Sequence, residues 1–238
     1  MRLLVGSSGY AFKEWKGPFY PEELKDDGFL GYYATRMPTV EINSTFYRLP
    51  KESVLREWAS QVPDDFLFTL KASQRITHFA RLRPEAADAL GFLLKNTQVM
   101  GDKLGVILFQ LPPNLQKDLP RLQAFLELLP AGRRFAFEFR HPSWFGDDVV
   151  AELRARNAAM AVIEQEDFSS PMIPTAEWGY LRLHRFDYDE RMLELWARRI
   201  RDEPWKEAFV FFKHDMGPGS GPQACAAFGG LLTQADPP

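Results

Sequence analysis

The sequence lacks most of the features that mark secreted or membrane proteins. Its 238 residues include one cysteine, Cys225, so no disulfide framework can form within the chain. No apolar run approaches the ~18 residues that a membrane-spanning helix needs. The first ten residues, MRLLVGSSGY, lack the apolar core of a signal peptide. We therefore expect a cytoplasmic protein with no membrane partner.

The chain also lacks a strong charge of either sign and the compact motifs of several enzyme classes. Its formal net charge is -3, which favours neither nucleic acid nor a membrane surface as a partner. No H-E-x-x-H motif, cysteine pair or dinucleotide-binding fingerprint occurs. We therefore predict no cofactor and no bound metal. Nucleic acid remains a possible partner that is not favoured.

What the chain does contain is a regular alternation of strand and helix signals. Segments with apolar residues at helical spacing lie between most of the strand-like segments, and only a weak one follows the sixth. Such alternation is typical of a parallel sheet with helices outside it. Eight units in a chain near 250 residues predict an α/β fold, a single (β/α)8 TIM-type barrel domain with eight parallel strands over residues 1–238. A doubly wound open sheet is the alternative. The strand-like segments are 2–8, 39–45, 66–72, 105–111, 134–140, 159–165, 179–185 and 208–214.

The segment 39–45, TVEINST, carries polar residues on one face of a strand that should be buried. Val40 and Ile42 share one parity, and Glu41 and Asn43 share the other. In a barrel the apolar set would face the helices, so the polar set would point inward. Applied to the other strands, the same parity places six more polar residues inward: Lys71, Gln110, Glu138, Arg140, Arg182 and His184.

Charged side chains in a barrel interior need a physical account, because a buried unpaired charge costs several kcal/mol. The carboxyl ends of barrel strands are also where barrel enzymes hold their active sites. All four histidines lie at or after predicted strand ends, where imidazole is a common acid or base: His78, His141, His184 and His214. The alternative is an ion lattice that only fills the barrel.

Eight motifs carry a resemblance to a known family. In chain order they are GSSGY, WKGPFYP, VEINSTFYRLP, ITH, LFQLPP, FEFRHPSW, YLRLH and FFKHD. The chain resembles the YecE-like family (domain of unknown function, number seventy-two) through nearly its whole length. The resemblance implies a TIM-type barrel. It implies no defined activity beyond a loose comparison with sugar isomerases and related metal-dependent barrels.

The chain matches the family pattern at most of the inward positions and departs from it elsewhere. Tyr10 stands where tryptophan is usual, Arg185 where glycine is usual, and Lys213-His214 where an asparagine pair is usual. The matching positions that also point inward are Glu41, Asn43, Lys71, Glu138, Arg140, Arg182 and His184.

The favoured hypothesis is an enzyme that works by general acid/base chemistry without metal on a small anionic, phosphorylated or sugar-like substrate. Three inward cations face two inward carboxylates, so the pocket should attract an anion. We predict Glu41 or Glu138 as the base, His184 as the acid or its relay, and Lys71 as an electrostatic stabiliser or, less favoured, a Schiff-base lysine. The glycine-rich segment 215–224 is a candidate phosphate loop. The predicted substrate-binding residues are Asn43, Tyr47, His78, Gln110, Arg140, His141, Arg182 and Asp215.

Two other classes of function stay open. A metal-dependent isomerase, hydrolase or nuclease would draw its ligands from the carboxylates and histidines, although the Arg and Lys residues would repel a divalent cation. A non-catalytic protein would bind a small molecule or nucleic acid between loop aromatics such as Phe46 and Tyr47. Replacing Glu138 by Gln separates these classes, because it should abolish turnover in an enzyme and only weaken affinity in a binding protein.

Overall fold

The strands of the computed structural model, which describes residues 1–48, 50–213 and 220–233, lie in two parallel sheets. One sheet has four strands, in the order β1 (Arg2–Ser7), β9 (Glu207–Phe212), β8 (Trp178–Leu183) and β7 (Val162–Glu164). The other has five, in the order β2 (Thr39–Ile42), β3 (Leu67–Lys71), β4 (Leu104–Gln110), β5 (Arg134–Glu138) and β6 (Ala159–Met160). Every neighbouring pair within each sheet is parallel.

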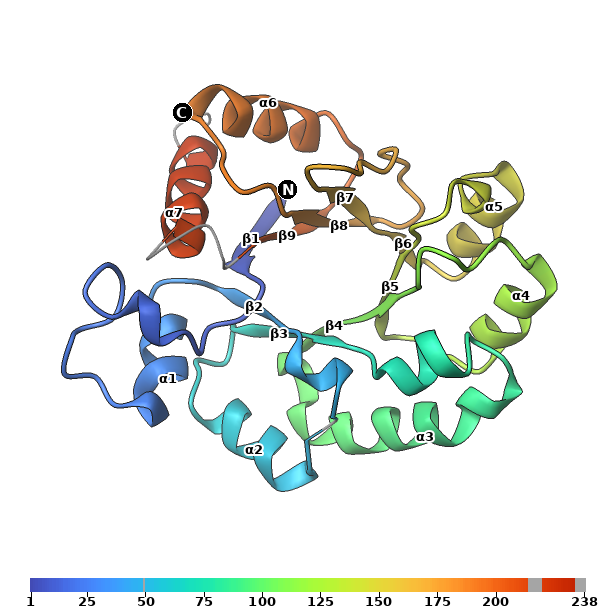
Figure 1. Ribbon diagram of the computed structural model, residues 1–238, viewed down its shortest axis with the longest axis horizontal. Helices are drawn as coiled ribbons and strands as arrows, with labels where there is room; N and C mark the ends of the chain where they lie inside the picture. The colour runs from blue at the N-terminus through green and yellow to red at the C-terminus, as the bar shows by residue number, and fades with distance from the viewer. Residues whose placement is uncertain (49, 214–219, 234–238) are drawn as a thin grey trace.

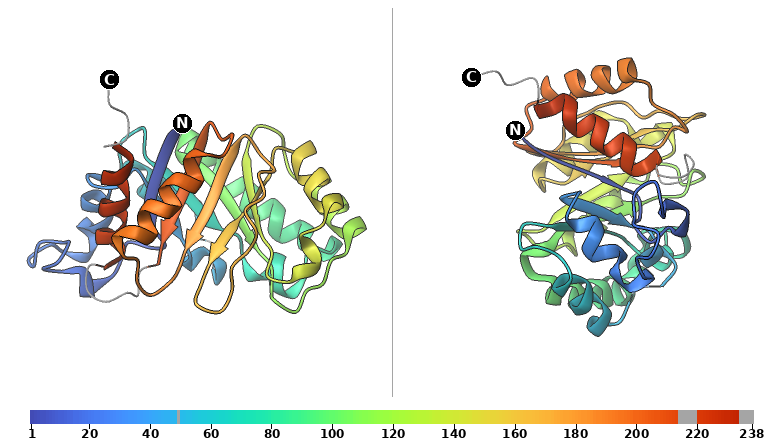
Figure 2. Two further views of the ribbon diagram at one scale, coloured as in Figure 1. Left: turned by 90° about the horizontal axis from the view of Figure 1, so that it is seen from above. Right: turned by 90° about the vertical axis from the view of Figure 1, so that its left-hand side faces the viewer.

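The helices lie on the outer sides of the two sheets (Figures 1 and 2). They are α1 (Phe29–Ala34), α2 (Glu52–Ser60), α3 (Ala87–Asn96), α4 (Leu119–Glu127), α5 (Asp147–Ala155), α6 (Glu190–Arg201) and α7 (Ser220–Thr233). Short helical turns join the elements at Lys13–Trp15, Asp26–Gly28, Ser44–Phe46, Arg75–Phe79, Pro84–Ala86, Thr97–Lys103 and Pro142–Trp144. Within these described ranges, none of the helices combines the length and apolar character needed to span a membrane.

Helix α6 shows how local sequence sets these elements. Asp189 precedes it and accepts a hydrogen bond from the Met192 N–H at 2.7 Å, which satisfies one donor of the first turn. Its apolar face, which includes Trp196 and Ile200, is buried, while its other face is charged. After β7 the chain runs to β8 without a helix, consistent with the weak helical signal in that segment and with Pro171 and Pro174.

The prediction of one closed eight-stranded barrel is wrong. The segments predicted as strands do form strands, but 159–165 divides at Ala161 and serves both sheets. Its first part pairs with β5, and the Ala161 N–H still donates to the Phe137 carbonyl at 2.9 Å. Its second part pairs with β8. One expected strand therefore becomes two, and nine strands in two sheets replace eight in one among the described residues.

The second break in the strand ladder lies between β1 and β2, where a tyrosine hydroxyl bridges the two edges. The Tyr33 hydroxyl accepts a hydrogen bond from the Ser7 N–H at 2.8 Å and donates one to the Thr39 carbonyl at 3.1 Å. The edges approach closely, since a Cβ on Gly6 would lie 2.1 Å from the Thr39 carbonyl oxygen. Tyr33 is fully buried and comes from α1. A side chain thus takes the place of a backbone ladder.

The two sheets face each other across a shared apolar core. Side chains of both sheets meet there, such as Leu4 and Phe211 from one sheet and Leu108 and Ala136 from the other. Two further apolar clusters fill the space between the sheets and the surrounding helices. These inward-facing side chains have the strand parity predicted from the sequence. The polar residues that share this parity at the strand ends therefore also lie between the sheets.

We expect Tyr33→Phe to lower the free energy of unfolding by about 1–3 kcal/mol, because it leaves the buried Ser7 N–H and Thr39 carbonyl without their shared partner. Tyr32→Phe is the matched control on the same helix, since no hydrogen bond of its hydroxyl holds the two edges together. Urea unfolding of both variants measures the difference. Equal stability of Tyr33→Phe and the control would show that the hydroxyl does not join the sheets.

Candidate functional site

A buried ion-pair cluster joins the two sheets at the carboxyl ends of their strands. Its centre is Arg182 of β8, which lies between Glu41 of β2 and Glu138 of β5. The guanidinium donates to Glu41 through Nε at 3.0 Å and Nη2 at 2.9 Å, and to Glu138 through Nη1 at 2.6 Å. Both carboxylates are fully buried and Arg182 is 4% exposed. The single charge of Arg182 is therefore shared between two carboxylates that belong to the other sheet.

Neutral donors and a second cation occupy the remaining carboxylate lone pairs. Glu41 accepts hydrogen bonds from the Ser8, Tyr180 and Asn43 side chains at 2.7, 2.5 and 3.0 Å. Glu138 accepts from the amide of Gln110 at 2.6 Å and from Nε of Arg140 at 2.7 Å. All four carboxylate oxygens thus have donors, as buried anions require. We call these residues, together with His184, the polar cluster.

The environment keeps both carboxylates ionised. Burial acts to raise the pKa of Glu41, but the Arg182 charge and the hydrogen bonds from Arg182, Tyr180 and Ser8 hold it below its usual range. Burial likewise opposes ionisation of Glu138, whose pKa is nevertheless lowered to about 2 by Arg182 and Arg140. All four of their oxygens already accept hydrogen bonds, so a proton taken up by either carboxylate would disrupt an existing contact. Their role here is to hold other groups in place.

A hydrogen-bond chain runs from Glu41 through Ser8 to His184. The Ser8 hydroxyl has a single proton and donates it to Glu41 Oε1 at 2.7 Å, so His184 must donate its Nε2–H to Ser8 Oγ at 2.8 Å. Burial, and next the charge of Arg182, hold the pKa of His184 well below its usual range, so the ring is neutral. Nδ1 therefore carries a lone pair, and it has no hydrogen-bond partner within the described residues.

Lys71 lies near the cluster, and its ammonium has neither an ion pair nor a hydrogen bond within the described ranges. Its Nζ lies 4.3 Å from the centre of the Phe46 ring. Burial, followed by the charges of Arg182 and Arg140, lowers the pKa of Lys71 to about 8, although Glu138 and Glu41 act in the opposite direction. Lys71 is thus a half-buried ammonium that gives up its proton more readily than an exposed lysine.

Arg140 adds a second cation beside Lys71, and His78 lies close to both. Arg140 uses Nε for Glu138, and its two terminal nitrogens make no hydrogen bond within the part of the chain that is described. His78 lies edge-on to Phe46, with ring centres 4.8 Å apart. Burial lowers the pKa of His78, and Lys71, Arg140 and Arg81 lower it further. These cations are therefore close enough for their charges to act on one another.

A cavity of about 330 Å³ adjoins the polar cluster at the ends of β1 and β2. Ser8 and Asn43 belong both to its lining and to the hydrogen bonds of Glu41. Asn43 Oδ1 is buried and has no hydrogen-bond partner among the described residues, because the amide nitrogen is directed at the carboxylate. An unpaired buried acceptor beside a cavity invites a ligand hydroxyl or a water molecule. The other lining residues are Gly9, Tyr10, Ala11, Phe12, Ile42, Ser44, Tyr47 and Trp58.

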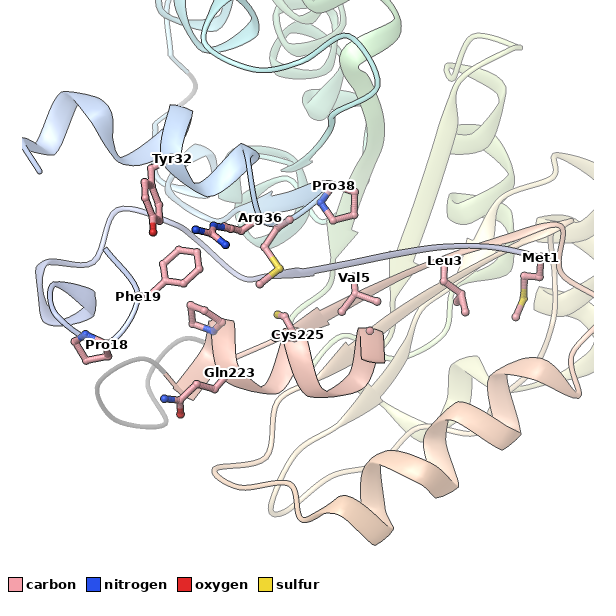
Figure 3. Close-up of a pocket in the computed structure, with 14 residues that line it drawn as sticks. Met1, Leu3, Val5, Pro18, Phe19, Tyr32, Arg36, Pro38, Gln223 and Cys225 are labelled. Atoms are coloured by element: carbon pink, nitrogen blue, oxygen red, sulfur yellow. The ribbon is translucent and has the colours of Figure 1, made fainter. Parts of the chain in front are cut away.

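A larger cavity, of about 880 Å³, lies elsewhere and differs in chemistry. It separates the outer face of β1 from α7 and the end of α1 (Figure 3). Apolar side chains such as Leu3, Phe19 and Met37 line it, and Arg36 is its one charged lining residue. Cys225 is buried at its wall. This cavity has few groups that could perform acid/base chemistry.

Comparison with known proteins shows the family of this chain. The family described as "Protein of unknown function DUF72" matches residues 4–237. The chain belongs to the DUF72 family. The chain is similar to the crystal structure of a DUF72 family protein from Thermotoga maritima, with a TM-score of 0.86, 25% identity and coverage of 98% of this chain and 100% of that one. A second, from Enterococcus faecalis, has a TM-score of 0.82 at 16% identity, covering 99% and 97%.

Two curated relatives have names but no stated activity. The "UPF0759 protein YunF" of Bacillus subtilis is 22% identical over 90% of this chain and 89% of its own length. The "UPF0759 protein YecE" of Escherichia coli is 36% identical over 48% of this chain, and the match spans only 42% of that relative. The family resemblance read from the motifs is thereby confirmed. It carries no substrate with it.

The structure brings most of the predicted site residues of this DUF72 chain together. Seven of them share hydrogen bonds in the polar cluster. Lys71 and His78 lie beside the cluster and interact electrostatically with Arg140 and Glu138. Tyr47 is 73% exposed and lines the cavity. His141 anchors a loop through Ser143 at 2.8 Å. The seven are Glu41, Asn43, Gln110, Glu138, Arg140, Arg182 and His184.

Three other predictions concern residues outside the described ranges: Asp215, His214 and most of the glycine-rich segment 215–224. Two participants were missed as site residues, Ser8 and Tyr180. The parity signal was available for both, since Ser8 continues the inward set of Leu4 in β1 and Tyr180 precedes Arg182 by two. Within the described ranges, no three His, Cys, Asp or Glu side chains are arranged to hold a metal ion.

We expect Arg182→Met to lower the free energy of unfolding at pH 7 by about 3–5 kcal/mol, because it leaves two buried carboxylates without their shared cation. The loss should shrink as the pH falls, since the carboxylates then become protonated and need no counter-charge. Arg198→Met is the control, because this side chain is 70% exposed in a surface pair with Glu194 and should change stability by less than about 0.5 kcal/mol. Urea unfolding at pH 7 and pH 4 measures both variants. A pH-independent loss in Arg182→Met would contradict the electrostatic account.

Proposed function

We propose that this protein is an enzyme that binds a small anionic, phosphorylated or sugar-like substrate between the two sheets and acts on it by proton transfer. The observation that carries the proposal is the unused positive charge at the site. Glu41 and Glu138 are satisfied by Arg182, Arg140 and neutral donors, so Lys71 is left over. A site of this kind favours a phosphate or carboxylate group.

The hydrogen-bonding capacity left at the site supports a substrate with both an anionic group and hydroxyls. The Lys71 ammonium and the terminal nitrogens of Arg140 are donors suited to the anion. Asn43 Oδ1 is an acceptor suited to a hydroxyl. The cavity beside Ser8 and Asn43, about 330 Å³, is large enough for a small metabolite. Such a combination fits a sugar phosphate or a hydroxy acid.

For the proton transfer we assign His184 as the base, acting through Nδ1. Its Nε2–H is held by Ser8 and Glu41, which fixes the tautomer and the direction of the Nδ1 lone pair. A proton taken by Nδ1 creates a cation at the end of a chain that terminates in the Glu41 carboxylate, which partly balances the charge. Glu41 and Glu138 are positioning residues in this scheme, because each of their oxygens already accepts a hydrogen bond that holds a neighbouring side chain.

The binding step is tested with inorganic sulfate and phosphate. At constant ionic strength set with chloride, either anion should raise the melting temperature. The free energy of unfolding should rise by about 2.7 kcal/mol when the anion concentration reaches about 100 times Kd. Lys71→Met and Arg140→Met should each reduce the gain. Lys206→Met is the control, since it removes an exposed cation paired with Glu177 away from the site. No stabilisation of the unsubstituted protein by either anion would overturn the anionic substrate.

The catalytic step is tested by deuterium uptake. Incubation with sugar phosphates and hydroxy acids in heavy water should place deuterium on carbon in at least one compound, as read by mass spectrometry. His184→Gln keeps a hydrogen-bonding side chain but cannot accept a proton, so it should lose the uptake at least about 100-fold while sulfate still stabilises it. Anion binding without uptake in any compound would instead identify a binding protein.

A further inference from the structure

We propose that Lys71 is a nucleophile, and that the substrate is a small anionic aldehyde or ketone that forms an imine with its side-chain nitrogen. The inference rests on the proposed function and adds the chemical class of the substrate. It starts from the contrast between Lys71 and the other cations near the polar cluster, Arg140 and Arg182. Both arginines are held by carboxylates, and guanidinium groups do not act as nucleophiles at neutral pH.

Geometry makes the Lys71 nitrogen available. No carboxylate oxygen lies within 4.0 Å of it in the described ranges, because Arg182 and Arg140 lie against Glu41 and Glu138. A lysine at hydrogen-bond distance from a carboxylate keeps its proton, and one surrounded by arginines and buried gives it up more readily. Burial and the nearby arginines lower the pKa of Lys71 to about 8, so a useful fraction is the free amine near neutral pH.

The neighbours of Lys71 also suit the product. The Phe46 ring, 4.3 Å from Nζ, attracts a cation and would attract the iminium at the same place. The terminal nitrogens of Arg140 can receive the carboxylate or phosphate of the substrate. A hydroxyl of the substrate can donate to Asn43 Oδ1. These three groups are the ones that the polar cluster leaves unsatisfied, and each suits one functional group of a small hydroxylated, anionic carbonyl compound.

The step balances without any further reactant. The amine lone pair attacks the carbonyl carbon, a carbon–nitrogen bond forms, and the carbonyl π electrons move to oxygen. The resulting carbinolamine loses its hydroxyl, which takes up a proton and leaves as water, so that amine plus carbonyl become imine plus water. Nothing is oxidised or reduced. The imine then makes the C–H bond of the adjacent carbon more acidic, and His184 would remove the proton from that carbon.

The test is reductive trapping with two small aldehydes and sodium cyanoborohydride, read by peptide mass mapping. Glyoxylate carries a carboxylate, and glycolaldehyde is a neutral compound of similar size. Lys103 is the internal control, because it is also half-buried but binds Asp64 and the Ala59 and Val62 carbonyls. At pH 7 we expect Lys71 to be labelled at least ten-fold faster than Lys103 by both aldehydes, because the Lys103 ammonium is held by a carboxylate and two carbonyls, whereas Lys71 Nζ has no such partner within the described ranges. The labelling rate should rise with pH and level off above about pH 8.

The outcomes separate this inference from the proposed function. Preferential labelling of Lys71, faster with glyoxylate and slowed about ten-fold for glyoxylate alone by Arg140→Met, supports both. Equal labelling of Lys71 and Lys103 overturns the nucleophile even if sulfate stabilises the protein. Preferential labelling by both aldehydes with no effect of Arg140→Met and no effect of sulfate upholds the nucleophile and overturns the anionic substrate. The first comparison needs only the unsubstituted protein, so poor folding of a variant cannot obscure it.

Discussion

The contact on which the rest of the site depends is the one between the Arg182 guanidinium and two buried carboxylates. Arg182 belongs to one sheet, and Glu41 and Glu138 belong to the other. None of the three could be buried alone, because an uncompensated charge in the core costs several kcal/mol. Their mutual neutralisation holds the carboxyl ends of the two sheets at a set distance. It also determines which neighbouring groups stay free to meet a ligand.

The two breaks in the strand ladder define where one sheet ends and the other begins, and the polar cluster bridges the sheets at one of them. At Ala161 the chain passes from one sheet to the other, and at Tyr33 a hydroxyl replaces a backbone ladder between β1 and β2. Ser8 follows β1 at this second break, and Glu41 and Asn43 lie on and after β2. The hydrogen-bond chain from Glu41 to His184 therefore crosses the gap between the sheets. The cavity beside Asn43 opens at the same place.

An ion lattice and a functional site are not exclusive descriptions of this cluster. Its centre is a saturated lattice, since all four oxygens of Glu41 and Glu138 accept hydrogen bonds. Its edge is unsaturated, with the Lys71 nitrogen, the His184 Nδ1 and the Asn43 Oδ1 lacking partners among the described residues. The division follows from distance, because Arg182 lies between the two carboxylates and no carboxylate oxygen lies within 4.0 Å of the Lys71 nitrogen in the described ranges.

The sequence alone determined where the strands lie and which residues point between them. Period-two alternation in 39–45 placed Glu41 and Asn43 on the buried polar side, and the same alternation placed Glu138, Arg182 and His184. The division of the strands into two sheets could not be predicted, since it depends on one residue, Ala161, within a continuous apolar segment. The ion pairs could not be predicted either, because parity states that Lys71 and Arg182 face inward but not which of them reaches a carboxylate. Only the tertiary structure decided that Arg182 takes both carboxylates and leaves Lys71 without one, since that choice depends on distances between strands far apart in the chain.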